Sequence, residues 1–228
     1  MRAQVAAPAL VLALGLAACG GDASTNDPLS GAQLVVDVKG DHAKALNADG
    51  VEPKNPPDAA DVTGVRLDAS EDSLSIRIAI AGSPYESASI TDPLQGPAWF
   101  MQLFADTKAA SPAYFVAIVR EGEPSRAGEQ IKGWRLSVCP GTEVCNEPAE
   151  GATLKITESE VRADIPLTLL SKLKNPFTWA MQSYWNETQD PVQAHSDWVP
   201  EAARPSPGAT TYSEPDTRAT FPPEGSKK

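Results

Sequence analysis

Four aspartates with the chemistry of a cation site lie near the two ends of an irregular stretch. Asp37 and Asp41 follow an apolar segment, and Asp58 and Asp61 precede the next one. If the two ends meet in space, these carboxylates hold a hard cation such as calcium, which takes six to eight oxygen ligands. No contiguous calcium-loop motif is present, and scattered surface aspartates are expected in an acidic protein. A structural calcium is therefore one alternative, and no other cofactor is expected.

The chain contains the residue types that hydrolases use for catalysis, but their spacing in the sequence does not match a known catalytic motif. His195-Ser196-Asp197 are contiguous, whereas catalytic triads are assembled in space. Glycoside cleavage needs two carboxylates that face each other across a cleft. The candidates in this chain are Glu143, Glu147 and Glu150, which we expect to lie in an exposed loop. The chain contains no strained serine turn with flanking glycines, no paired-histidine metal helix and no phosphate-cradling glycine loop. We expect no enzyme activity, and a hydrolase is the least favoured function.

Two tryptophans are the candidate ligand-binding residues. Trp185 and Trp198 lie next to Asn186 and Asp197, and an exposed aromatic ring with polar neighbours is a stacking surface for a sugar. Half-buried tryptophans in loops are the alternative.

The cysteines Cys139 and Cys145 are separated by a short turn, Pro140-Gly141-Thr142-Glu143-Val144. We expect a disulfide, which is typical of an oxidising compartment and contributes about 2 kcal/mol for so short a loop. A catalytic or metal-binding thiol pair would need closer spacing or further ligands, which no neighbouring Cys or His supplies.

The N-terminus has the pattern of a secretory signal peptide over residues 1–18. Arg2 precedes an apolar run at residues 5–16, and small residues precede Cys19. The run is too short for a membrane span of about 20 apolar residues. Leu16-Ala17-Ala18-Cys19 resembles the lipobox of bacterial lipoproteins, which implies acylation (palmitate) of Cys19 and a lipid anchor at the extracytoplasmic face of the cell membrane. Gly20 follows the cysteine in place of the aspartate of the known inner-membrane retention signal, so an outer membrane is possible in a cell with two membranes.

The charge balance excludes some partners. The chain has 19 basic and 30 acidic residues, and removal of residues 1–18 takes Arg2 away, so the mature charge is 18 − 30 = −12. Such acidity argues against nucleic acid and against a basic membrane-binding face, because both partners present phosphate.

Periodicity and turn residues predict an all-β chain. Residues 19–32 are expected to be a lipidated tether, residues 33–203 one domain and residues 204–228 a disordered tail. Alternating apolar residues predict two hairpins, at residues 62–80 and 154–165, and nearly continuous apolar runs at residues 98–105 and 113–119 predict buried strands. Further strands are expected at residues 34–38, 134–138 and 177–185, and one short helix at residues 166–173. The expected fold is an antiparallel β-sandwich, jelly-roll-like, with that one helix.

The order of these elements resembles the β-sandwiches of carbohydrate-binding module family 9 and DOMON-type domains. The matching pieces are Asp58-Ala59-Ala60-Asp61-Val62-Thr63-Gly64-Val65, the hairpin at residues 67–80, the segment at residues 99–107, and the segment at residues 163–170 before Phe177-Thr178-Trp179. The resemblance implies binding of sugars, haem or other ligands. Haem-binding members use Met and His ligands, but Met101 and Met181 lie in apolar strands and are expected in the core, and the only histidines are His42 and His195.

These observations predict a membrane-anchored extracytoplasmic lipoprotein whose sandwich is a non-catalytic binding module, with a carbohydrate or cell-wall component as ligand. The alternative is a structural or accessory subunit that binds a protein partner.

Overall fold

The computed structural model describes residues 29, 31–37, 43–44, 58–85, 96–127, 130–141, 145–186, 194–200 and 218–223. Cys19, Asp41, His42 and Glu143 lie outside the described residues, as does the signal peptide. The described part contains no helix that is long and apolar enough to cross a membrane.

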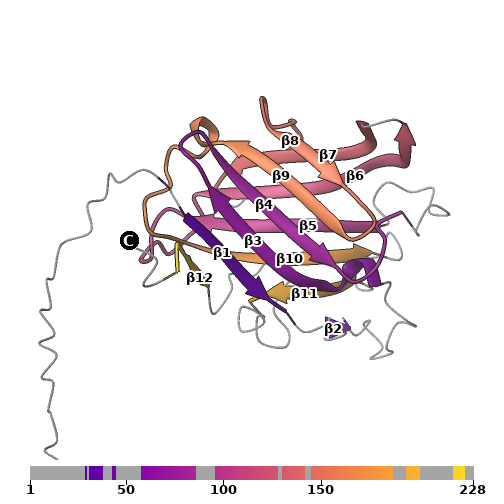
Figure 1. Cartoon of the computed structure of the whole chain (residues 1–228), viewed down its shortest axis with the longest axis horizontal. Helices are drawn as coiled ribbons and strands as arrows, with labels where there is room; N and C mark the ends of the chain where they lie inside the picture. The colour runs from indigo at the N-terminus through magenta and orange to yellow at the C-terminus, as the bar shows by residue number, and fades with distance from the viewer. Residues whose placement is uncertain are drawn as a thin grey trace, which may run out of the picture.

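The chain forms two antiparallel sheets packed face to face (Figure 1), so the predicted all-β sandwich is confirmed. The first sheet has five strands in the order β1-β3-β4-β9-β8. Its strands are β1 (Gly31–Val36), β3 (Val62–Ala69), β4 (Ser73–Ile80), β8 (Thr153–Ile156) and β9 (Glu160–Pro166). Both predicted hairpins, β3-β4 and β8-β9, are present, and β4 pairs with β9 to join them.

The second sheet has seven strands, ordered β2-β11-β10-β5-β6-β7 with β12 also on β10. Its strands are β2 (Ala43–Lys44), β5 (Gly96–Phe104), β6 (Tyr114–Ala127), β7 (Gln130–Pro140), β10 (Phe177–Asn186), β11 (Ala194–Val199) and β12 (Ala219–Phe221). The two apolar runs form the inner strands β5 and β6, in which the side chains of residues 97–104 and 114–118 are buried on both faces of the sheet.

The core between the sheets follows the period-two pattern of the strands. Strand β4 contributes Leu74, Ile76, Ile78 and Ile80, all at most 4% exposed. They face Trp99 and Met101 of β5 and the aromatic residues of β10 in one continuous cluster. Burial of alternate side chains from both sheets is what holds such a sandwich together.

The prediction of a wholly disordered tail from residue 204 is wrong, because Ala219–Phe221 form β12. Strand β12 pairs with β10 at Phe177–Trp179, beyond the segment that β11 covers. The Phe221 side chain is fully buried, with its ring centroid 5.1 Å from that of Phe177. The burial of this one aromatic side chain stabilises the short strand. The polar residues around Phe221 are why the sequence did not predict a strand there.

The predicted helix is also shorter than expected. Pro166 ends strand β9, and only Leu167–Leu170 form a 3-10 helix, η2. The first 3-10 helix, η1 (Asp58–Ala60), precedes β3. The leucines at residues 167–173 therefore form a single 3-10 turn, which places Leu170 in the core, rather than a two-turn α-helix.

The domain starts earlier than residue 33. Leu29 is 7% exposed and belongs to the core cluster, and β1 begins at Gly31. A Cβ added at Gly31 would come within 3.3 Å of Pro222, so the first and last strands lie together. The tether predicted over residues 19–32 is therefore shorter than expected, because Leu29 and the start of β1 belong to the folded domain.

Candidate functional site

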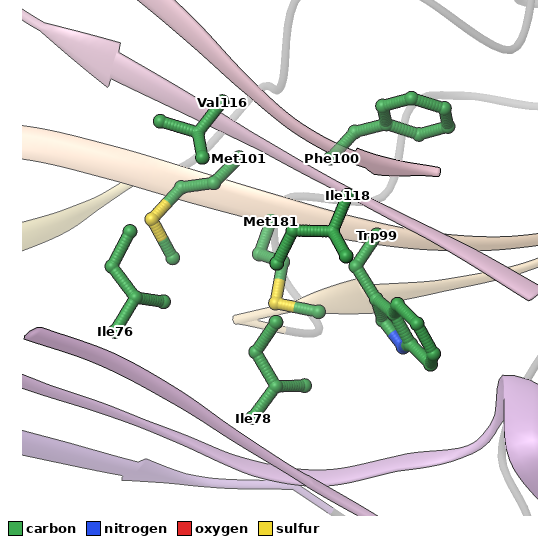
Figure 2. Close-up of a pocket in the computed structure, with 8 residues that line it drawn as sticks. All are labelled: Ile76, Ile78, Trp99, Phe100, Met101, Val116, Ile118 and Met181. Atoms are coloured by element: carbon green, nitrogen blue, oxygen red, sulfur yellow. The ribbon is translucent and has the colours of Figure 1, made fainter. Parts of the chain in front are cut away.

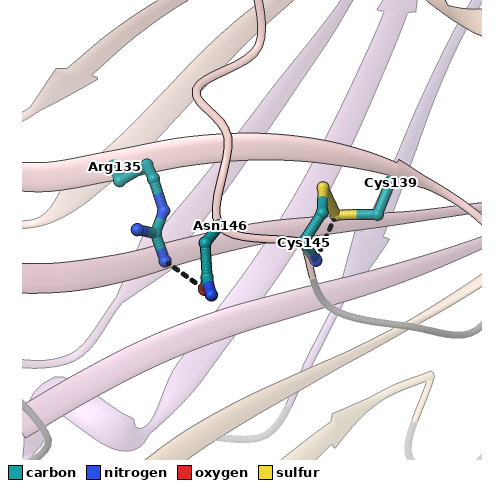
Figure 3. The surroundings of a disulfide bond; sticks show 4 residues. All are labelled: Arg135, Cys139, Cys145 and Asn146. Atoms are coloured by element: carbon teal, nitrogen blue, oxygen red, sulfur yellow. Dashed lines mark hydrogen bonds between the residues drawn. A yellow bond between two sulfur atoms is a disulfide. The ribbon is translucent and has the colours of Figure 1, made fainter.

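The predicted disulfide is present between Cys139 and Cys145 (Figure 3). Cys139 lies one residue before the end of β7, is 1% exposed and packs on the outer face of the second sheet. The backbone N–H of Cys145 donates to the Cys139 sulfur at 2.8 Å, and Arg135 donates to the Asn146 side chain at 3.3 Å. These contacts fix the start of the segment that follows the disulfide, as a structural role requires.

The two candidate tryptophans lie on the paired strands β10 and β11. Trp198 pairs with Gln182 and Trp185 pairs with His195, so the register does not place the tryptophans opposite each other. Trp198 is 3% exposed and packs on Ala180. Its ring therefore offers no open face to a sugar, which corrects the expectation for this residue.

Asp197 is a fully buried carboxylate that ties the two sheets together. It accepts hydrogen bonds from the backbone N–H of Val62, at 2.8 Å, and of Trp198, at 2.9 Å. Ser183 of β10 is the register partner of Asp197, and its hydroxyl donates a hydrogen bond to the backbone carbonyl of Ala60 in η1. A carboxylate that accepts backbone hydrogen bonds from two strands holds those strands together, which gives Asp197 a structural role.

Three of the four predicted calcium aspartates gather around the start of β3. The backbone N–H of Asp37 donates to Thr63 at 3.1 Å, and that of Asp61 donates to the carbonyl of Asp58 at 3.2 Å. Asp61 is 1% and Asp37 8% exposed, whereas Asp58 is exposed. Within the described residues no group of three or more Asp, Glu, His or Cys side chains is placed to hold a metal. The calcium site stays a prediction, which chelation with a thermal melt and elemental analysis would test.

The described glutamates near the disulfide, Glu147 and Glu150, are exposed in the segment after Cys145. Neither has a described partner carboxylate in a cleft. Their setting is the loop that the sequence predicted.

The core holds a small apolar cavity of about 10 Å³ between the sheets (Figure 2). Its lining includes Met101 and Met181, whose sulfur atoms lie among Ile76, Ile78 and Trp99. A cavity of this volume is barely large enough for one water molecule. Met101 and Met181 are 3% and 1% exposed, so both methionines are core residues, as predicted.

The outer face of the five-stranded sheet is the exposed surface with the most distinctive pattern. At its edge, β1 is uncharged and carries Leu34 and Val36, which are 61% and 74% exposed and are the large exposed hydrophobic residues of the described part. Natural edge strands usually carry charges, prolines or bulges that prevent pairing with other chains, and β1 carries none of these between Gly31 and Val36.

Beyond that edge, the register aligns a row of cations across the strands. Arg66 pairs with Arg77, Arg77 with Arg162, and Arg162 with Lys155. We call these four residues the cationic row. The next row on one side contains Asp68, Ser75 and Asp164.

Two ion pairs join the rows. Arg66 binds Asp68 through two hydrogen bonds of 2.7 and 2.9 Å, and Arg162 binds Asp164 at 3.0 Å. The hydrogen bond from Arg66 holds the pKa of Asp68 below its usual value. Burial raises the pKa of Asp164, but the polar interactions with Ser75 and the hydrogen-bonded Arg162 outweigh it, so that pKa is also lowered.

Sequence reasoning missed this surface because the cations are far apart in the chain. The alternation of Arg66 with Leu67, and of Arg77 with Ile76 and Ile78, does place each arginine on the solvent face of its strand. The alignment of the row depends on β4 pairing with β9, which no local signal predicts.

Comparison of the chain with models of protein families, with curated proteins and with solved structures gave no match.

Proposed function

We propose that this chain is a lipid-anchored extracytoplasmic protein whose β-sandwich acts as a non-catalytic binding module. The observation that carries the proposal is the motif Leu16-Ala17-Ala18-Cys19 behind an apolar run. The disulfide between Cys139 and Cys145 supports it, because such bonds persist in oxidising compartments. With these two cysteines bonded to each other, Cys19 is the remaining thiol of the three in the chain.

The anchor is tested by Cys19→Ser with Ser24→Ala as the matched control. We expect wild type and Ser24→Ala to incorporate labelled palmitate and to sediment with membranes, because two or three acyl chains hold a domain there stably. Cys19→Ser should incorporate no label and move to the soluble fraction. A Cys19→Ser protein that still carries label on the membrane would refute the anchor.

The ligand that we propose first is a carbohydrate or cell-wall component. The burial of Trp198 moves the binding surface away from that residue and toward exposed positions such as the outer face of the five-stranded sheet. A polysaccharide pull-down with the full chain in detergent tests this, and a blank result on neutral and charged glycans alike would refute it.

A second candidate function, an accessory subunit that binds a protein partner, is favoured by the exposed β1 edge. An added strand would pair with the open edge and cover Leu34 and Val36. Lysine at both positions should abolish co-purification of a stoichiometric partner from membranes, since charges on an edge strand oppose strand addition. Thr153→Lys, on the opposite edge strand β8, is the matched control. Equal co-purification in all variants would contradict this function.

A further inference from the structure

The cationic row places four positive charges side by side on a protein whose net charge is strongly negative. Neighbouring strands lie about 4.8 Å apart, so the row spans about 14 Å. Like charges directly opposite each other on paired strands are destabilising. Four neighbouring cations are stable only if anions lie close to them, and the described ion pairs involve only Arg66 and Arg162.

The two outer arginines have their own carboxylates. Arg66 is held by Asp68 and Arg162 by Asp164, and both aspartates lie on the same side of the row. These ion pairs fix the two guanidinium groups in place on either side of Arg77.

Arg77 is the arginine of the row that forms no ion pair with a described residue, whereas Arg66 and Arg162 each do. It is half-buried, and none of its hydrogen-bond donors meets an acceptor among the described residues. Its Nε is shielded from solvent and has no hydrogen-bond partner. Asp68 lies close enough for the charge of Arg77 to lower its pKa, but that carboxylate takes its hydrogen bonds from Arg66. A shielded donor that lacks an acceptor is costly, and more so when it is charged.

The side of the row opposite the aspartates offers access. The register places Gly64 and Ala79 there, next to Arg66 and Arg77, and both positions have little or no side chain. Glu160 continues this row opposite Ala79, so its carboxylate lies beside Arg162 and the path to Arg77 runs over Ala79. Ala79 is exposed to solvent. A small group can therefore approach Arg77 from this side.

We propose that Arg77, between Arg66 and Arg162, binds a tetrahedral oxyanion: a phosphate or sulfate group of a larger ligand. A guanidinium is a planar fork that donates two parallel hydrogen bonds to such a group. Three guanidinium groups supply hydrogen-bond donors for the several oxygens of a tetrahedral oxyanion, more than the two oxygens of a carboxylate can accept. Lys155 extends the positive row toward the rest of the ligand. The inference deepens the proposed binding function and rests on it, since it names the chemistry that the binding module recognises.

The test titrates the full chain, purified in detergent, with sodium phosphate and sodium sulfate against sodium chloride of matched ionic strength. We expect a saturable rise in Tm of about 3–6 °C at tenfold the Kd, by mass action on the folded state. Arg77→Gln should abolish the rise, Arg77→Lys should weaken the binding at least fivefold, and Lys108→Gln, on the exposed turn after β5, should respond as wild type does.

A second readout separates binding from a structural role. Without phosphate and at low salt, Arg77→Gln should melt at or above the temperature of wild type, because it removes the repulsion from Arg66 and Arg162. A Tm below wild type for this variant, or a phosphate response that survives in it or equals that of chloride, would overturn the proposal.

Two further ligands identify the source of the anion. Arg77-dependent binding of glycerophosphoglycerol points to a lipid headgroup, and Arg77-dependent binding of dextran sulfate, with neutral dextran as control, points to a substituted glycan; either supports the oxyanion site. Because these titrations do not use the anchor, a blank result leaves the Cys19 test intact, and loss of the anchor leaves anion binding intact.

Discussion

Phe221→Ala tests whether the C-terminal strand is part of the fold. The side chain is fully buried and stacks with Phe177 at 5.1 Å. Truncating a buried phenylalanine costs about 3–5 kcal/mol, from lost burial and the cavity left behind. For a domain of this length, 1 kcal/mol corresponds to about 2–4 °C in Tm. We therefore expect the Tm to fall by about 6–20 °C.

The assay is thermal and urea unfolding of the full chain with its disulfide intact. Thr220→Ala, one residue away and half-buried, is the matched control, and should change stability by less than about 0.5 kcal/mol. A double-mutant cycle with Phe177→Ala should give a coupling energy of about 0.5–1.5 kcal/mol for the ring pair. If Phe221→Ala and Thr220→Ala melt at the same temperature, the assignment of β12 to the core is refuted.

Three further predictions concern the sheets. Gln33→Ala should cost about 1–3 kcal/mol in urea unfolding, because the buried Trp179 indole N–H loses the acceptor that it has at 2.9 Å; an unchanged midpoint would show that this bond does not hold β1. Cys145→Ser should cost about 2 kcal/mol, and reductant should lower wild-type stability but leave this variant unaffected. Asp68 and Asp164 have lowered pKa values in the folded state, so their contribution to stability is present above the usual Asp pKa of about 3.9 and is lost as the pH falls through the lowered values. The Asp→Asn variants should therefore show a smaller drop in Tm between pH 7 and pH 3 than wild type shows.

The sequence allowed the fold class and the hairpins to be predicted because those signals are local. Alternation over Leu74, Ile76, Ile78 and Ile80 indicates one buried face, and the polar turn before it sets the pairing with β3. The disulfide could be predicted for the same reason, because Cys139 and Cys145 are only six residues apart and a turn between them brings the two sulfur atoms together.

Features that depend on long-range pairing could not be predicted in this way. Strand β12 reaches β10 across the sequence, and only the register reveals that Phe221 meets Phe177. The cationic row needs three strand pairings at once, and the strongly negative net charge pointed away from any local cluster of cations. Trp198 looked accessible because polar residues flank it, yet its neighbours in the sheet bury it.

The burial of Leu29 sets a limit on how far the domain can travel. Ten Cα-to-Cα steps separate Cys19 from Leu29 (29 − 19 = 10). Fully extended, that stretch reaches about 35 Å, which is comparable with the roughly 30 Å thickness of a bilayer's hydrocarbon core. A sandwich anchored at Cys19 would therefore sample a shell only about as deep as the membrane is thick. Any ligand or partner must then come to that surface, because the protein cannot reach out to meet it.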